Sequence, residues 1–213
     1  MGKPGLLKAS DYPSYAEKQV TAHTPEEIAY LYSQSQDDDD RFFLSFFLGS
    51  GVRENEAAHA ETSDLVGTTL LVKAKRAYNW SPKKKRSRKV EITPELAAAI
   101  KSRPPGLLFP NRDNRPNGHL LRIIQRLGQG GGFEVELHRL RKTWASMLFL
   151  AGVPLTKLQA MLGHESLETT QRYLADIELQ RGDLAKSLAK ASAVLGPPRP
   201  TLVVAAESAE SVA

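Results

Sequence analysis

The sequence reads HRLRKTWAS at residues 138–146, LGHES at residues 162–166 and TTQRY at residues 169–173. His138 and Arg141 are three positions apart, so a helix presents both on one face. The apolar residues that follow them would pack this helix into the core. Gly163 is suited to end a second helix directly before His164. This order would bring two histidines, an arginine and Tyr173 together around one phosphate group.

These stretches resemble the catalytic half of the tyrosine recombinases, also called phage integrases. That family carries His-x-x-Arg, then Leu-Gly-His, then a nucleophilic tyrosine nine residues later, in the order of His138, Arg141, His164 and Tyr173 here. The family has a further arginine upstream, in a Gly-x-Arg-x-x-Glu pattern after an apolar helix, which matches Arg53. The resemblance covers roughly residues 15–176 and implies the fold of the DNA breaking-rejoining enzymes.

The resemblance implies that Arg53 and Arg141 bind the phosphate at the cleaved bond. A guanidinium group is planar and always charged, and its donors match phosphate oxygens. In an enzyme without a metal, such groups stabilise the charge that gathers at phosphorus. Glu56, one turn after Arg53, is suited to hold its guanidinium. His138 and His164 would donate hydrogen bonds to phosphate oxygens or exchange protons near neutral pH.

Tyr173 is the expected nucleophile. The unperturbed pKa of a phenol is about 10, so Tyr173 must lose its proton as it attacks, and nearby cations favour that loss. In the family, attack forms a 3′-phosphotyrosyl bond and frees a 5′ hydroxyl. The bond keeps the energy of the broken DNA strand. The resemblance therefore implies strand cleavage and rejoining without ATP, a metal or another cofactor.

The family also uses a lysine on a β-hairpin to protonate the leaving 5′ oxygen. We predict Lys75 for this role because it stands at the end of the strand expected at residues 68–72, with Lys73 as the alternative. Residues 76–86 would form a longer tip than the short turn often seen in the family.

Nine of the 29 Lys and Arg residues fall within residues 73–89, and no acidic residue does. We expect this basic segment to follow the DNA backbone, where each neutralised phosphate makes binding more sensitive to salt. A solvated basic loop or a localisation signal is the alternative interpretation. The predicted DNA-binding residues are Lys73, Arg76, Lys83, Lys84, Lys85 and Arg86.

Periodic patterns predict an α+β domain that is mostly α-helical and has a small antiparallel β-sheet. Thr24 is a suitable N-cap, Pro25 suits the first helical position, and Glu27 completes the spacing of a capping box. The acidic run at residues 37–40 should form the solvated first turn of the next helix. Residues 42–48 should bury that helix in the core.

After Arg53 the pattern becomes typical of β-structure. Residues 68–72 and 88–92 are rich in alternating and β-branched residues and predict a hairpin. Further helices are predicted from residue 93, over residues 120–127, and in a helix–turn–helix–turn–helix series from residue 137.

Length and composition favour one catalytic domain over residues 24–194, preceded by an extended arm at residues 1–23 and followed by a flexible tail at residues 195–213. The chain has 213 residues, a net charge of +5 and no cysteine, which excludes disulfides and thiolate metal sites and fits a reducing cytoplasm. No apolar run is long enough to span a membrane.

The expected partner is double-stranded DNA. By resemblance, four protomers would assemble on two DNA sites, with a monomer or weak oligomer in the absence of DNA. The apolar pattern of residues 177–194 suits docking on a neighbouring protomer or packing on its own domain. Family members usually carry a helical DNA-binding domain ahead of the catalytic one, so we expect this chain alone to bind DNA weakly and with little specificity.

Other classes of function fit the sequence less well. A metal hydrolase would need His59, His138 and His164 as ligands, but their spacing is not that of a metal motif. A regulatory or DNA-binding remnant of an integrase would normally lack the nucleophile or an arginine. A type IB topoisomerase uses similar residues, but Leu-Gly-His followed closely by Tyr173 favours the recombinase. Base contacts and DNA deformability set the target site, and no motif here encodes them.

Overall fold

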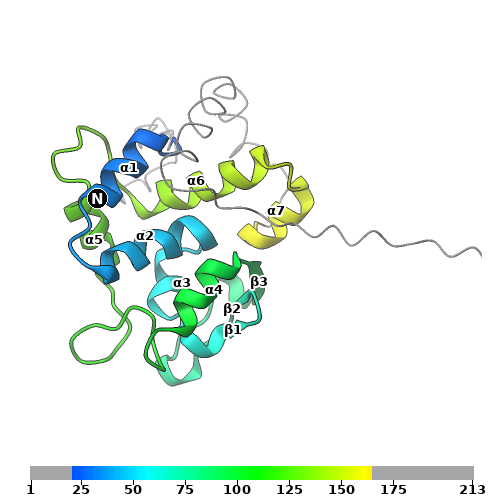
Figure 1. The fold of residues 1–213 in the computed structure, drawn as a ribbon. Coiled ribbons are helices and arrows are strands. Elements are labelled where there is room, and N and C mark those ends of the chain that lie inside the picture. The colour runs from blue at the N-terminus through cyan, green and yellow to red at the C-terminus, as the bar shows by residue number, and fades with distance from the viewer. Residues whose placement is uncertain (1–20, 165–213) are drawn as a thin grey trace, which may run out of the picture.

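The computed structural model describes residues 21–164, a helical domain with one small sheet (Figure 1). Its helices are α1 (Pro25–Ser33), α2 (Asp38–Ser50), α3 (Glu54–Ala58), α4 (Pro94–Lys101), α5 (Leu120–Leu127), α6 (Leu137–Leu150) and α7 (Leu155–Leu162). The strands are β1 (Leu65–Val66), β2 (Thr69–Val72) and β3 (Arg88–Glu91), and short 3-10 turns lie at Thr62–Asp64, Arg76–Tyr78 and Lys83–Lys85. This architecture confirms the predicted fold class. No helix within the described residues is long and apolar enough to cross a membrane.

Helices α2 and α6 lie side by side through the middle of the domain, with α1 and α5 at one end and the sheet, α3 and α4 at the other (Figure 1). The phenylalanines of α2 surround Phe109 and form the aromatic core with it. Gly51 ends α2 in the left-handed region at φ 57°. A Cβ at Gly51 would lie 2.1 Å from the ring of Trp144 on α6. Only glycine therefore allows α6 to approach the end of α2, directly before Arg53.

The predicted cap of α1 is confirmed, and the acidic start of α2 is confirmed in part. Thr24 and Glu27 form the reciprocal capping box. Asp37 is the N-cap of α2 and accepts a hydrogen bond from the backbone of Asp40. The expectation that this run is solvated was wrong for Asp40, which is buried and ion-paired with Arg126 of α5. Arg126 lies more than 80 residues from Asp40 in the sequence, so a local run of acidic residues cannot predict this pairing.

The sheet is antiparallel in the order β1–β2–β3, and Val72 pairs with Arg88 at the start of the hairpin tip. The predicted strands 68–72 and 88–92 are thus confirmed to within a residue at each end. Strand β1 was not expected. Helix α3 was not expected either, because the β-pattern was predicted to follow Arg53 at once, whereas Arg53 is the N-cap of this short helix.

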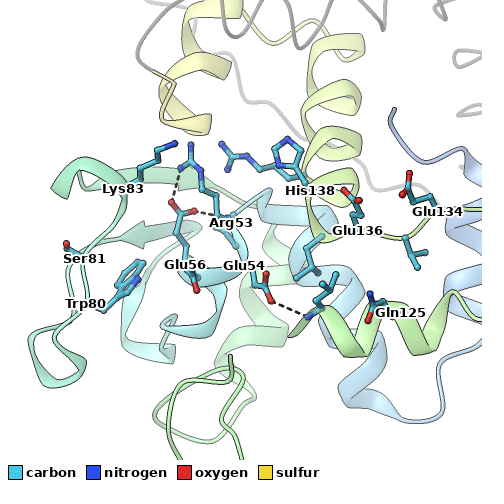
Figure 2. Close-up of a pocket in the computed structure, with 16 residues that line it drawn as sticks. Arg53, Glu54, Glu56, Trp80, Ser81, Lys83, Gln125, Glu134, Glu136 and His138 are labelled. Atoms are coloured by element: carbon cyan, nitrogen blue, oxygen red, sulfur yellow. Dashed lines mark hydrogen bonds and ion pairs between the residues drawn. The ribbon is translucent and has the colours of Figure 1, made fainter. Parts of the chain in front are cut away.

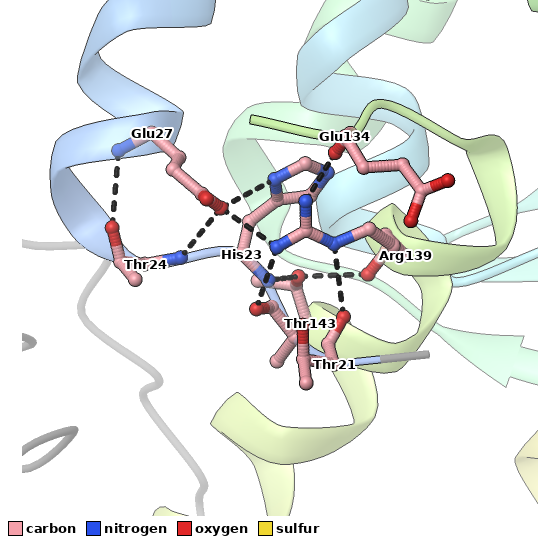
Figure 3. Close-up of polar contacts among 8 residues, drawn as sticks. Thr21, His23, Thr24, Glu27, Glu134, Arg139 and Thr143 are labelled. Atoms are coloured by element: carbon pink, nitrogen blue, oxygen red, sulfur yellow. Dashed lines mark hydrogen bonds and ion pairs between the residues drawn. The ribbon is translucent and has the colours of Figure 1, made fainter. Parts of the chain in front are cut away.

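The residues before α1 are tied to α6 by one buried arginine (Figure 3). Arg139 Nε donates to the carbonyl of Thr21 at 3.1 Å, and its Nη2 donates to Glu27 at 2.9 Å. The backbone N–H of His23 donates to Thr143 Oγ1 at 2.8 Å. Burial, and then the charge of Arg139, lower the pKa of His23 to about 4. A neutral His23 therefore packs on α6 next to the turn that carries His138.

Candidate active site

Arg53, His138 and Arg141 line one cavity of about 880 Å³ between the start of α3 and the start of α6 (Figure 2). Arg53 comes from the junction of α2 and α3, and the other two come from the first two turns of α6, three residues apart. The close packing of α2 on α6 brings these two parts of the chain together. Three of the predicted catalytic residues therefore meet in space, although almost 90 positions separate them in the sequence.

Arg53 is held by Glu56, as expected. Its Nη1 donates to Glu56 Oε1 at 3.0 Å, and its backbone N–H donates to Oε2 at 2.7 Å. Glu56 also receives two hydrogen bonds of 2.6 Å from Arg88. Burial opposes ionisation of Glu56, but these arginines outweigh it and lower the pKa of Glu56 to about 2. An ionised Glu56 thus orients Arg53, whose side chain is 31% exposed and faces the cavity.

Arg141 is fixed more firmly, because it is buried and its terminal nitrogens donate to backbone carbonyls. Nη1 donates to the carbonyl of Gly51, and Nη2 donates to the carbonyl of Leu162. The first contact joins α6 to the end of α2, and the second joins it to the last turn of α7. A cation is favourable at such a helix C-terminus. Arg141 therefore sets the positions of the segments that carry Arg53 and His164.

The charges of these arginines affect the pKa values of both histidines. Burial, followed by the charges of Arg141 and Arg53, lowers the pKa of His164 to about 4. Partial enclosure and then Arg141 lower the pKa of His138. Both imidazoles are therefore neutral near pH 7. A bound phosphate would bring negative charge that opposes this shift.

The predicted hairpin lysines do not lie in the cavity. Lys75 is buried, and its Nζ donates to Glu61 Oε2 at 2.6 Å and to Asp64 Oδ1 at 2.7 Å. Lys73 Nζ lies 3.3 Å from Asp64 Oδ1. The prediction of Lys75 rests on its place after the strand expected at residues 68–72. In the structure, Lys75 pairs with Trp80 in a small turn, and Glu61 and Asp64 bind the two ammonium groups.

Lys83 is the lysine that lines the cavity. Figure 2 shows its side chain pointing from the hairpin toward Arg53. Lys83 is exposed, and within residues 21–164 no hydrogen-bond or ion-pair partner fixes its ammonium group. From the sequence, Lys83 is predicted only as one of the residues that follow the DNA backbone. Its neighbours Lys84, Lys85 and Arg86 are also exposed, as is Arg76.

Three contributors to this region were missed. Arg88 was assigned only to a strand, yet it binds Glu56, and Glu61 and Asp64 were not singled out although they bind Lys75. An arginine in a short strand and acids in a turn carry no local pattern that names their partners. The only available signal was the excess of positive charge in the hairpin, which calls for acids nearby.

Other predicted residues fall elsewhere. Tyr173 lies outside the described residues, which end at His164, and so do the tail and the segment 177–194. His59 does not line the cavity. Its ring stacks on Trp80 with centroids 4.4 Å apart, and its Nδ1 bonds to the carbonyl of Asn55. Within residues 21–164, no group of three or more His, Cys, Asp or Glu residues is arranged to hold a metal ion.

Comparison with known proteins gives matches to phage integrases and tyrosine recombinases. A model of the phage integrase family matches residues 19–178. The tyrosine recombinase XerA of Saccharolobus solfataricus is 24% identical over 162 residues, which are 76% of this chain and 54% of XerA. The chain spans about half the length of such curated relatives.

Solved structures share the fold. An integrase of the Tn1549 transposon in complex with circular intermediate DNA superposes with a TM-score of 0.61 at 20% identity, covering 82% of this chain and 71% of the integrase. The catalytic domain of bacteriophage HP1 integrase gives a TM-score of 0.56 at 21% identity, covering 84% of this chain and 97% of that domain. These superpositions confirm the catalytic-domain fold predicted from the sequence.

Proposed function

The chain belongs to the phage integrase family, and on this premise we propose that it is a site-specific recombinase that cleaves and rejoins DNA strands. Tyr173 is the proposed nucleophile. Its attack on a phosphodiester would form a 3′-phosphotyrosyl bond and release a 5′ hydroxyl. The reverse attack by a 5′ hydroxyl would rejoin a strand without ATP.

One observation carries this proposal: Arg53, His138 and Arg141 line a single cavity. The negative oxygens of a phosphodiester repel a nucleophile, so fixed positive groups must stabilise the charge that develops at phosphorus. Arg53 is oriented by an ionised Glu56, and Arg141 by two backbone carbonyls. Both groups are thus in place before substrate binds, which is the arrangement that electrostatic stabilisation needs.

The neutral histidines suit proton exchange in this site. A neutral imidazole carries one N–H donor and one acceptor nitrogen. His138 and His164 can therefore donate to phosphate oxygens, or take up the proton that Tyr173 loses as it attacks. Tyr173 follows His164 by nine residues, which is the spacing in the family and the reason for its assignment.

Lys83 is the group that we propose protonates the leaving 5′ oxygen. It lines the cavity with Arg53 and His138, whereas the ammonium groups of Lys73 and Lys75 bind carboxylates. An ammonium group lowers the cost of expelling an alkoxide because it supplies the proton that the oxygen needs. The exposed neighbours of Lys83 would contact the DNA backbone on either side of the cleaved phosphate.

Double-stranded DNA is the proposed substrate, and a tetramer on two DNA sites is the proposed active assembly. The exposed basic tip of the hairpin supports the first proposal. Binding of DNA by this basic surface should depend strongly on salt, because each neutralised phosphate releases counterions.

The experiment is a search for covalent protein–DNA adducts. The chain and its Tyr173→Phe variant are incubated with supercoiled plasmid in chelator, quenched with detergent, and examined for DNA that travels with protein. Adducts or relaxed plasmid that require Tyr173 would support the proposal. Equal yields from both proteins would refute it. Plasmid binding without adducts from either protein would indicate a role in DNA binding alone.

A further inference from the structure

Arg88 lies where three parts of the candidate site meet. It begins β3, and its side chain is 8% exposed. Nη1 and Nη2 donate to the two carboxylate oxygens of Glu56, each at 2.6 Å. Nε donates to the carbonyl oxygen of Met161 at 2.7 Å. One guanidinium group thus binds both the residue that holds Arg53 and the last turn of α7.

The first link runs from Arg88 through Glu56 to Arg53. The oxygens of buried Glu56 accept two hydrogen bonds from Arg88 and two from Arg53. Loss of Arg88 would remove half of these contacts and leave the carboxylate with one cationic partner. A buried carboxylate in that situation moves toward other donors or toward solvent. The guanidinium of Arg53 would move with it.

The second link runs from Arg88 to the turn that carries His164. Arg88 binds the carbonyl of Met161, and Arg141 binds the next carbonyl, that of Leu162. Gly163 then turns the chain in the left-handed region at φ 66°. A Cβ on Gly163 would lie 3.0 Å from Cδ of Arg88, so the turn rests directly on this side chain.

We infer that Arg88 is a positioning residue that fixes Arg53, through Glu56, and the Gly163–His164 turn in one arrangement. The inference rests on the proposed function, because it assumes that Arg53 and His164 act on one phosphate. Arg88 does not line the cavity, and each of its three nitrogens donates to Glu56 or Met161. Its role depends on the shape of guanidinium. A lysine would keep the charge but cannot bind three acceptors in one plane.

The test compares Arg88→Lys and Arg88→Gln with a control, Arg126→Gln, which breaks an ion pair to buried Asp40 without touching the cavity. Adduct formation on supercoiled plasmid is timed at saturating protein, below the melting temperature of every variant. Misplaced groups should slow both Arg88 variants by roughly 100-fold, with plasmid affinity unchanged within experimental error. Arg126→Gln should keep the wild-type rate. A wild-type rate for Arg88→Lys would overturn the inference.

A double-mutant cycle separates positioning from general damage. If Arg88 acts through Arg53, then Arg88→Lys should slow the Arg53→Lys variant much less than it slows the parent, because the two effects are coupled. Full additivity of the two losses in the logarithm of the rate would contradict the inference, since an unrelated structural defect gives that result.

A second readout does not require DNA cleavage. Orthovanadate mimics pentacoordinate phosphorus and is titrated into the whole chain while the ring Cε1–H resonances of His138 and His164 are followed by NMR. Weaker vanadate binding in Arg88→Lys, but not in Arg126→Gln, would support the inference even if wild type forms no adduct, in which case only the proposed function fails. Absence of vanadate binding to wild type, or equal affinity in Arg88→Lys, would overturn it.

Discussion

The base and the tip of the hairpin carry the same kind of side chain in opposite surroundings. At the base, buried Lys75 binds Glu61 and Asp64 at 2.6 and 2.7 Å. At the tip, exposed Lys83 lines the cavity that contains Arg53. Eight positions separate the two lysines, so composition treats them alike. The number of fixed carboxylate partners distinguishes a lysine that stabilises the fold from one that is available to a substrate.

Replacement of Lys83 should give the largest effect. We expect Lys83→Ala to slow adduct formation by roughly 100-fold or more, the contribution typical of a positioned general acid, while the melting temperature stays close to that of the parent. The measurement is the single-turnover rate of adduct formation on plasmid, with thermal unfolding recorded for each protein.

The control for Lys83→Ala removes the need for a proton. After the cleavage position in an oligonucleotide is mapped, a second substrate is made in which sulfur replaces the bridging 5′ oxygen at that position. A thiolate leaves without protonation far more readily than an alkoxide does. The variant should then cleave nearly as fast as the parent. If Lys83→Ala cleaves the ordinary substrate at the parental rate and Lys75→Met does not, then Lys75, and not Lys83, protonates the leaving oxygen.

Replacement of Lys75 should act mainly on stability. Lys75→Met leaves buried Asp64 with Lys73 alone and Glu61 without its closest cation. Removal of one partner from a buried ion pair costs about 3 kcal/mol or more. Urea unfolding measures the loss, and the folded variant assayed at low temperature should cleave within a few-fold of the parent. An unchanged free energy of unfolding would show that the base does not stabilise the domain.

The stability that Lys75 and its carboxylate partners contribute at the base of the hairpin should also depend on pH, and this is the smallest expected effect. Burial raises the pKa of Glu61, but the hydrogen bond and charge of Lys75 outweigh it and lower the pKa below the ordinary value of 4.5. A carboxylate with a depressed pKa stabilises the fold above its unfolded pKa, and this stabilisation is lost as the pH falls through the folded value.

The difference in unfolding free energy between the parent and Lys75→Met should therefore shrink as the pH is lowered from 6 through the depressed pKa of Glu61. The corresponding difference for Lys83→Ala should stay near zero throughout. Urea titrations at a series of pH values measure the free-energy differences of both variants. A Lys75→Met difference that is constant with pH would contradict the stabilising role of the ion pairs of Lys75.

Much of the site could be predicted because its residues lie in short local patterns. The three-residue spacing of His138 and Arg141 requires only one helix, and the Thr24 capping box requires only one helix start. Glu56 lies within one turn of Arg53 and reaches it as expected. Each of these contacts spans three residues, a range over which helical geometry alone fixes which side chains meet.

Contacts between distant segments were decided by the tertiary structure. Arg88 meets Glu56 and Met161, and Asp40 meets Arg126, only because separate elements pack together. Ion pairs between distant segments follow no fixed spacing in the sequence, so the basic residues of the hairpin did not indicate which acids would bind them. The sequence by itself determined the kinds of groups in the site and their order. Packing of α2 on α6, and of the Thr62–Asp64 turn against β2, determined that Lys83 lies with Arg53 while Lys75 binds Glu61 and Asp64.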